Sequence, residues 1–265
     1  MFHLFLRFPV TIGGGLEFKD GTLDSEGSVH LKIDSSGNVG INETSPDARL
    51  HIKGGNVIVE SSNNGGVDTN NNIILKDTDT TASSGQGIGS IQFYGSDASG
   101  AGAGIKSQIK AFYASNGNSS LLSFHTSDTS TNNIERMRID SSGNVGIGVT
   151  PYSHYTGYEA LDIGNTTALI SNNTGTNVTN LLQNAYLNSA GSAWTYKYTD
   201  EANQFYMANG EFNFENAPSG TAGSAITWTR RLTIQANGNV GIGTTSPNQK
   251  LDVEGSIRLN SPFAI

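Results

Sequence analysis

Residues 232–255, LTIQANGNVGIGTTSPNQKLDVEG, contain the pattern that organises this chain, because related versions occur twice more upstream. The other copies are LKIDSSGNVGINETSPDARLHIKG at 31–54 and MRIDSSGNVGIGVTPYSHYTGYEALDIG at 137–164. Their Gly-Asn-Val-Gly-Ile cores begin at Gly37, Gly143 and Gly238. That spacing exceeds the period of about 20–50 residues of a solenoid repeat. We call each copy a cassette and interpret it as a connector between larger modules.

Each cassette predicts a short hairpin followed by another strand. Alternating apolar residues such as Leu232 and Ile234 precede an Asn/Gly turn, and Val-Gly-Ile follows it, which is a typical hairpin pattern. A proline then interrupts the ladder, because its φ is fixed and it has no N–H to donate. The alternation resumes at Leu251 and Val253.

The glycines around the central isoleucine of a cassette leave one side of the strand without side chains, so we expect another backbone to approach closely there. These tight-approach glycines are Gly146, Gly148, Gly241 and Gly243. A cassette buries too little apolar surface to order itself alone. We therefore expect neighbouring modules or identical copies around a three-fold axis to cover it. The predicted trimer-packing residues are Val39, Ile41, Val145, Ile147, Val240, Ile242, Leu251 and Val253.

The string GNVGIGTTSP followed by KLDVEG resembles the repeat of bacteriophage tail fibres and tail spikes, which often lies upstream of an endosialidase-type intramolecular chaperone. The resemblance covers the three cassettes and implies a homotrimeric, β-rich, elongated fibre that joins a virus particle to a host surface. It also implies a virion or tail protein as partner at the N-terminal end. No chaperone-like segment follows Ile265, so we expect a mature or truncated chain, or a fibre that trimerises unaided.

The composition excludes several other classes. Charged residues make up 14% of the 265 residues, below the usual quarter or so, and Gly, Asn, Ser and Thr favour turns and strands over helices. The net charge of −8 argues against binding to nucleic acid, which depends on basic residues that neutralise phosphates. The chain has no cysteine, and no run reaches the roughly 18 apolar residues of a membrane helix. The apolar start MFHLFLRFPV lacks the marks of a signal peptide and is expected to be a docking strand.

The predicted fold is all-β: an elongated trimeric fibre in which β-prism or intertwined connectors alternate with antiparallel β-meander modules. The expected segments are an N-terminal attachment segment (1–30), connector cassettes (31–60, 137–165 and 232–265, the last with a C-terminal strand) and β modules (61–136 and 166–231). Strands are expected at 73–75, 88–94, 105–113, 121–125, 134–139, 193–199, 204–208, 211–214 and 226–234. A short helix near 177–187 is the rival interpretation, because four apolar residues there have helical spacing.

Aromatic residues are concentrated in the second module. Trp194, Tyr196 and Tyr198 alternate and therefore share one side of a strand, and Tyr206 and Trp228 are near in sequence. They are the candidate contacts to a host-surface glycan. The competing interpretation is a packing row in the core or between chains.

Signals for catalysis and metal binding are weak. Asp200, Glu201, Glu211 and Glu215 are the only acidic cluster near aromatics that could supply a glycosidase pair. Asp77 and Asp79 begin like a calcium loop, but no glycine at the sixth position and no glutamate at the twelfth follow. The five histidines are isolated in sequence. We expect no enzyme activity, no metal and no cofactor.

The sequence thus predicts a structural and adhesive homotrimer in a virion appendage outside the cell, with host-surface polysaccharide as partner. Three alternatives stay open: a tail-spike depolymerase, a bacterial extracellular adhesin or filament subunit, and a capsid decoration protein.

Overall fold

The computed structural model describes residues 15–19, 28–60, 72–97, 102–115, 119–128, 133–172, 174–175 and 177–258. Within these ranges all regular secondary structure is β-strand, which confirms the predicted all-β class. The chain divides into two compact units, Met1–Ile73 and Ile74–Ile265. Most of the predicted attachment segment and residues 259–265 of the third predicted connector lie outside the described residues.

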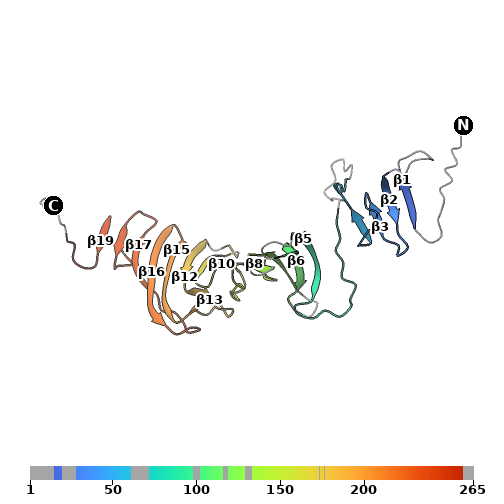
Figure 1. Ribbon diagram of the computed structural model, residues 1–265. Helices are drawn as coiled ribbons and strands as arrows, with labels where there is room; N and C mark the ends of the chain where they lie inside the picture. Colours follow the sequence, from blue (N-terminus) through green and yellow to red (C-terminus); the bar gives the residue numbers. More distant parts are fainter. Residues whose placement is uncertain are drawn as a thin grey trace. The chain divides into compact units, whose positions relative to one another are not determined.

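The first unit is a four-stranded sheet of β1 (Leu16–Lys19), β2 (Val29–Ile33), β3 (Val39–Ile41) and β4 (Leu50–Ile52) in chain order (Figure 1). The first two pairings are antiparallel and the last is parallel. Registered partners point to the same side of a sheet, and this register produces one wholly apolar face. Its two rows are Phe18, Leu31, Ile41, Ile52 and Leu16, Ile33, Val39, Leu50.

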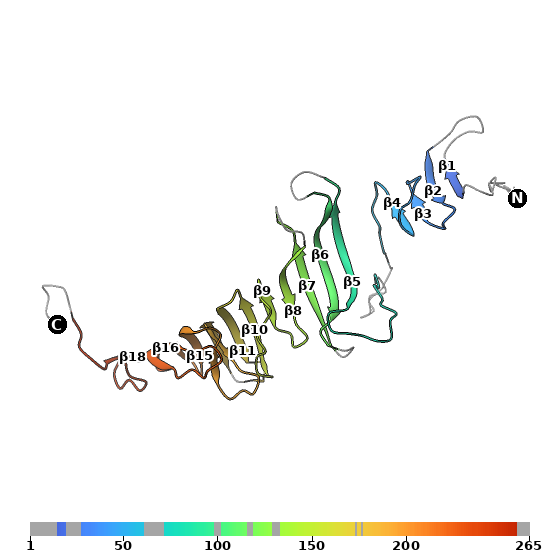
Figure 2. The same cartoon turned by 60° about the horizontal axis from the view of Figure 1, so that its bottom comes forward.

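The second unit is built on one sheet of thirteen strands, in the order β19-β18-β17-β16-β15-β12-β11-β10-β9-β8-β7-β6-β5 (Figures 1 and 2). Its strands are β5 (Gly87–Gly95), β6 (Gly104–Tyr113), β7 (Ser120–Thr126), β8 (Ile134–Ile139), β9 (Val145–Ile147), β10 (Tyr158–Ile163), β11 (Thr167–Asn172), β12 (Val178–Gln183), β15 (Asp200–Ala208), β16 (Glu211–Gly220), β17 (Thr229–Ile234), β18 (Val240–Ile242) and β19 (Leu251–Val253). Only the hairpin of β13 (Ala185–Leu187) and β14 (Trp194–Tyr196) leaves the sheet. The sheet is continuous through both predicted modules and the second and third cassettes.

All three cassettes have the same structure. The hairpins β2-β3, β8-β9 and β17-β18 are each followed by a strand that pairs in parallel, β4, β10 or β19. The connections span only 42–49, 148–157 and 243–250, whereas a parallel crossover usually takes about a dozen residues or more. These short connections must therefore pass directly over the middle of the preceding strand.

The central glycine of Val-Gly-Ile makes this crossing possible. A Cβ on Gly146 would lie 2.1 Å from the carbonyl oxygen of Val149, and a Cβ on Gly241 would lie 2.6 Å from that of Thr244. The backbone that approaches these glycines thus belongs to the same chain. The expectation that the bare glycine side meets identical copies is wrong, because the cassette's own crossover occupies that side.

Gly148 and Gly243 both stand at a turn, and only at Gly243 is the predicted close approach also present, because a Cβ there would lie 3.2 Å from the carbonyl oxygen of Glu254. Their φ angles are 68° and 77°, in the left-handed region that favours glycine. A Cβ on Gly148 would meet no atom within 4 Å. The first cassette has Asn42 at the equivalent place, with φ 56°. The backbone turn, rather than close approach, therefore explains Gly148.

Polar side chains tie the cassette hairpin to its crossover. The carboxylate of Asp34 accepts hydrogen bonds from the backbone N–H groups of Ser36 (2.8 Å) and Asn38 (2.9 Å) in the hairpin turn. The Asn38 amide donates to the carbonyl of Pro46 (3.3 Å), and in the third cassette Asn239 donates to that of Pro247 (3.2 Å). These bonds explain why the Gly-Asn turn and the following proline occur together in the first and third cassettes. In the second cassette Asn144 donates to the Asp140 carboxylate and accepts from the Ala160 backbone N–H instead.

Residues 177–187, for which a short helix was the rival interpretation, contain β-strands instead. Residues 178–183 form β12 between β11 and β15, and Asn184, with φ 57°, separates β12 from β13. The helix interpretation is therefore wrong, because the apolar pair Leu181 and Leu182 points to opposite sides of a sheet. The expected strand at 73–75 is also absent, and residues 72–79 have no ladder partner among the described residues.

Candidate functional site

One row of registered neighbours crosses all thirteen strands of the second unit on the same face of the sheet. We call it the central row and its face the open face. Its members are Gly89, Ala111, Leu122, Ile139, Val145, Leu161, Leu169, Leu181, Phe205, Phe214, Leu232, Ile242 and Val253. None of them is polar, so an unbroken apolar stripe runs through both modules and both cassettes.

Much of the central row is exposed. Leu181 is 51% exposed and Phe214 is 44% exposed. Phe205 packs its ring against that of Phe214, with centroids 4.8 Å apart, but the pair still faces outward. Contiguous apolar surface of this kind on a soluble protein marks an interaction site. The open face is therefore the principal candidate site.

A second row, here the side row, runs beside the central row on the open face. In β5 to β10 it is apolar: Ile91, Ile109, Phe124, Met137, Ile147 and Ile163. In β11, β12, β15 and β16 it continues as Thr167, Gln183, Asn203 and Asn216. The chemistry of this row therefore changes at β11, while the central row stays apolar.

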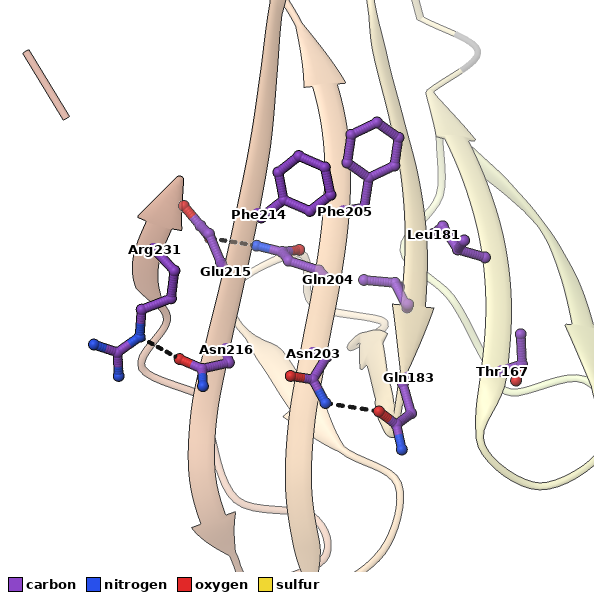
Figure 3. A pocket seen from close by; sticks show the side chains of 11 residues that line it. Thr167, Leu181, Gln183, Asn203, Gln204, Phe205, Phe214, Glu215, Asn216 and Arg231 are labelled. Carbon is purple, nitrogen blue, oxygen red and sulfur yellow. Dashed lines mark hydrogen bonds between the residues drawn. The ribbon is translucent and has the colours of Figure 1, made fainter. Parts of the chain in front are cut away.

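The polar part of the side row is a hydrogen-bonded set in an open groove of about 510 Å3 (Figure 3). The Asn203 amide donates to the Gln183 carbonyl oxygen at 2.7 Å. Arg231, which occupies a bulge of β17, donates from Nε to the Asn216 carbonyl oxygen at 2.8 Å. Phe205 and Phe214 stand along the apolar side of the groove. A smaller groove of about 360 Å3 lies on the other side of the central row.

The opposite face of the sheet has no comparable apolar stripe. In β6 to β8 it presents polar side chains such as Lys110, Ser123 and Arg138 in register. In β10 to β12 the hairpin β13-β14 covers it, which buries Ile170 and Leu182 completely or nearly so. The opposite face is therefore either lined with polar side chains or covered by a hairpin, whereas the open face is apolar and uncovered over most of its length.

A buried ionic network fixes the covering hairpin to the second cassette. The Asp162 carboxylate on β10 accepts hydrogen bonds from Lys197 Nζ at 2.6 Å, His154 Nε2 at 3.0 Å and the Tyr152 backbone N–H at 3.0 Å. The side chains of Asp162, Lys197 and His154 are fully buried. Burial alone raises the pKa of Asp162, but the hydrogen bonds from His154 and Lys197 outweigh it and hold that pKa below its ordinary value.

The surroundings of this network are aromatic. Lys197 Nζ lies 4.7 Å from the ring centroid of Tyr152, whose ring is in turn 4.8 Å from that of Tyr186. Burial, followed by contact with Tyr198, raises the pKa of Tyr152 to about 12. Asp162, Lys197 and His154 Nε2 join β10 to the segment after β14 and to the cassette crossover, so the network is a structural clamp, although the buried Nδ1 of His154 has no partner among the described residues.

The candidate glycan contacts do not form one exposed platform. Tyr196 is 4% exposed and donates its hydroxyl hydrogen bond to the Pro218 carbonyl at 2.6 Å, so it belongs to the core. Trp194 and Trp228 are partly buried against that core. Tyr206 is half-buried beside Arg230. Only Tyr198, 41% exposed, presents an open ring.

The acidic candidates do not gather at one site, although Asp200 and Glu201 contact each other. Glu215 is paired with Arg230 (Oε1 to Nε 3.0 Å) and lines the larger groove, whereas Glu211 lines the smaller one. Asp200 and Glu201 line neither groove. Asp77 and Asp79 accept hydrogen bonds within their own turn and from Gln86, as a surface turn does.

The polar face of the first module holds a serine and a histidine in contact. Ser123 Oγ lies 2.8 Å from His125 Nε2, but Ser123 is fully buried, so no substrate can reach it. Among the described residues, no group of three or more His, Cys, Asp and Glu side chains is placed to hold a metal ion. Within the same residues, no helix is long and apolar enough to span a membrane.

The predicted packing residues of the second unit all lie on the open face, and those of the first unit lie on its apolar face. The central isoleucines of the three cassettes, Ile41, Ile147 and Ile242, are 40%, 42% and 42% exposed. Sequence reasoning missed the aromatic and leucine members of the central row. The alternation in NQFYMA and EFNFEN was the available signal.

Comparisons with known proteins add little to this geometry. No protein-family model matches the chain, and no curated protein matches its sequence. One similar solved structure is the carboxy-terminal domain of the bacteriophage T5 L-shaped tail fibre with its intramolecular chaperone domain. The two are 10% identical, the match covers 79% of this chain and 67% of that chain, and the TM-score is 0.40. At that score the likeness carries no argument about function.

Proposed function

We propose that this chain is a structural and adhesive subunit of an extracellular viral fibre, and that copies of it associate through the open face as a homotrimer. The observation that carries the proposal is the central row, which is apolar on every one of thirteen strands. Leu75 packs onto it at Gly89, but Leu122, Leu169, Leu181, Phe214 and Ile242 are exposed. The resemblance of the three cassettes to tail-fibre repeats is the reason for proposing a viral fibre and an assembly of three chains.

The physical basis is the cost of leaving the central row in water. Burying a leucine or phenylalanine side chain contributes about 1.5–3 kcal/mol, and the row holds many such side chains in one line. Identical copies present identical rows, so one symmetric arrangement covers all of them at once. The exposed isoleucines Ile147 and Ile242 continue this surface through the second and third cassettes.

In this arrangement the opposite face points outward, and with it the hairpin β13-β14 and Tyr198. We propose this outer side of the second module as the contact to host-surface polysaccharide. Three copies held together raise avidity without strengthening any single contact. The proposal includes no catalytic step, and sustained release of oligosaccharides from host capsule or lipopolysaccharide would contradict that part.

Light scattering on the native protein tests the association, because the monomer mass is 27.9 kDa. We expect three times that mass. The double variant Leu181→Ser, Phe205→Ser removes two neighbouring members of the central row and is expected to shift the protein toward monomer. Tyr198→Ser, which changes an exposed ring on the other side, is the matched control and should keep the mass unchanged. A monomeric wild-type protein would refute the proposal.

A further inference from the structure

We propose that the polar part of the side row sets the axial register in which copies of this chain associate. This inference rests on the proposed self-association and assigns a task to Thr167, Gln183, Asn203, Asn216 and Arg231 on the open face. The partner it requires is the same segment of another copy.

The central row cannot specify a register by itself. It is apolar on every strand, and neighbouring strands are about 4.8 Å apart. A copy displaced by one or two strands would therefore still bring apolar side chains against apolar side chains. A surface that repeats in this way permits slipped pairings. Something other than the central row must distinguish the correct alignment.

The side row distinguishes it because its chemistry changes once, at β11. Up to Ile163 on β10 its members are apolar, and from Thr167 on β11 onward they are polar. In register, polar residues lie near polar residues and apolar residues near apolar ones. After a slip, Ile147 or Ile163 of one copy would lie near the amides of another, and a buried amide without a partner is penalised. A single polar position in an apolar coiled-coil seam specifies register in the same way.

The amides also have hydrogen-bonding capacity to spare. Gln183 and Asn216 each use their carbonyl oxygen within the chain, and Asn203 uses its amino group. The remaining atoms, Gln183 Nε2, Asn203 Oδ1 and Asn216 Nδ2, have no hydrogen-bond partner in the part of the chain that the structure describes. Two are donors and one is an acceptor, so an identical segment from another copy offers complementary groups.

Spin labels can measure the register directly, because the chain contains no cysteine. Ser189 lies in an exposed turn after β13, away from the open face. We would label Ser189→Cys with a nitroxide and measure distances between copies by pulsed electron paramagnetic resonance. The wild-type background should give one narrow distance. The triple variant Gln183→Leu, Asn203→Leu, Asn216→Leu should keep the mass of the assembly but show several distances.

The control is Thr179→Leu, which replaces a polar residue on β12 on the other side of the central row and should keep one narrow distance. A triple variant that keeps one narrow distance would overturn the register role and leave self-association intact. A triple variant that becomes monomeric would also overturn it, since the amides would then provide affinity. If the wild-type protein itself is monomeric, the proposed function fails together with this inference.

Discussion

Replacing Gly146 by alanine tests the idea that the cassette works because its crossover passes over a bare glycine. The added Cβ would lie 2.1 Å from the carbonyl oxygen of Val149 and 2.8 Å from Cδ of Pro151. Both are parts of the chain that cannot rotate away. The crossover must therefore lift, or β9 must move away from β10, with which it pairs in parallel at Val145 and Ile147.

The expected cost follows from this geometry. Overpacking of a well-filled site costs about 1–3 kcal/mol, and contacts this short with backbone place Gly146→Ala near the upper end. Gly148→Ala adds a Cβ in open space and costs only the backbone term, about 1–2 kcal/mol for a residue with a left-handed conformation. Gly148→Asn should be close to neutral, because Asn42 adopts the same conformation in the first cassette.

Hydrogen exchange followed by mass spectrometry, read at the amides of β9 and β10, measures this ranking locally. We expect Gly146→Ala to accelerate exchange there most, Gly148→Ala less, and Gly148→Asn hardly at all. Denaturant unfolding of the same variants gives the matching order of stability. The crossover argument is refuted if Gly146→Ala exchanges like the wild type, or if Gly148→Ala is the more damaging change.

Three further predictions concern the clamp, the aromatic residues and the cassette turn. Lys197→Met leaves the buried Asp162 carboxylate without its cation, so thermal melts should show a loss of about 3–5 kcal/mol. Because the folded pKa of Asp162 is lowered, its contribution is complete above the unfolded pKa of about 3.9 and disappears as pH falls through the folded pKa. Unfolding measured against pH should therefore lose part of its acid sensitivity in Asp162→Asn. Tyr196→Ala should destabilise by about 3 kcal/mol as a core truncation, while Tyr198→Ala should keep the melting temperature and weaken binding in a glycan-array assay. Asn239→Ala should cost about 1 kcal/mol in denaturant unfolding through its hydrogen bond to Pro247, and an unchanged midpoint would remove that tie from the explanation of the motif.

The strands of the first module were predictable because their alternation is local. Residues 105–113 and 134–139 were expected as strands and correspond to β6 and β8 almost residue for residue. The stretch 177–187 was not decided by its own pattern, since adjacent leucines fit a helix as well as a strand. Its conformation is set by β11 and β15, which pair with it from both sides, and β15 follows only after the hairpin β13-β14.

The source of the close approach at the cassette glycines could not be predicted from the sequence. A glycine indicates that something comes near, but it carries no information on which segment does so. The sequence-based expectation was that another copy of the chain approaches the glycine side of the strand, so that copies would associate there. The structure puts the crossover there and leaves the valines and isoleucines open, so the packing residues named from the sequence are on the exposed side for a different reason.

The buried clamp also arises from an ordinary cassette position. Asp252 in the third cassette accepts a hydrogen bond from the backbone N–H after Pro247 at 3.1 Å, as Asp162 does from the residue after Pro151 at 3.0 Å. Asp252 needs no further partner because it keeps contact with solvent. Asp162 is covered by β13-β14, and a covered carboxylate requires Lys197 and His154 to offset its desolvation. The ionic network therefore follows from the element packed onto the cassette, which is information that the repeat itself does not contain.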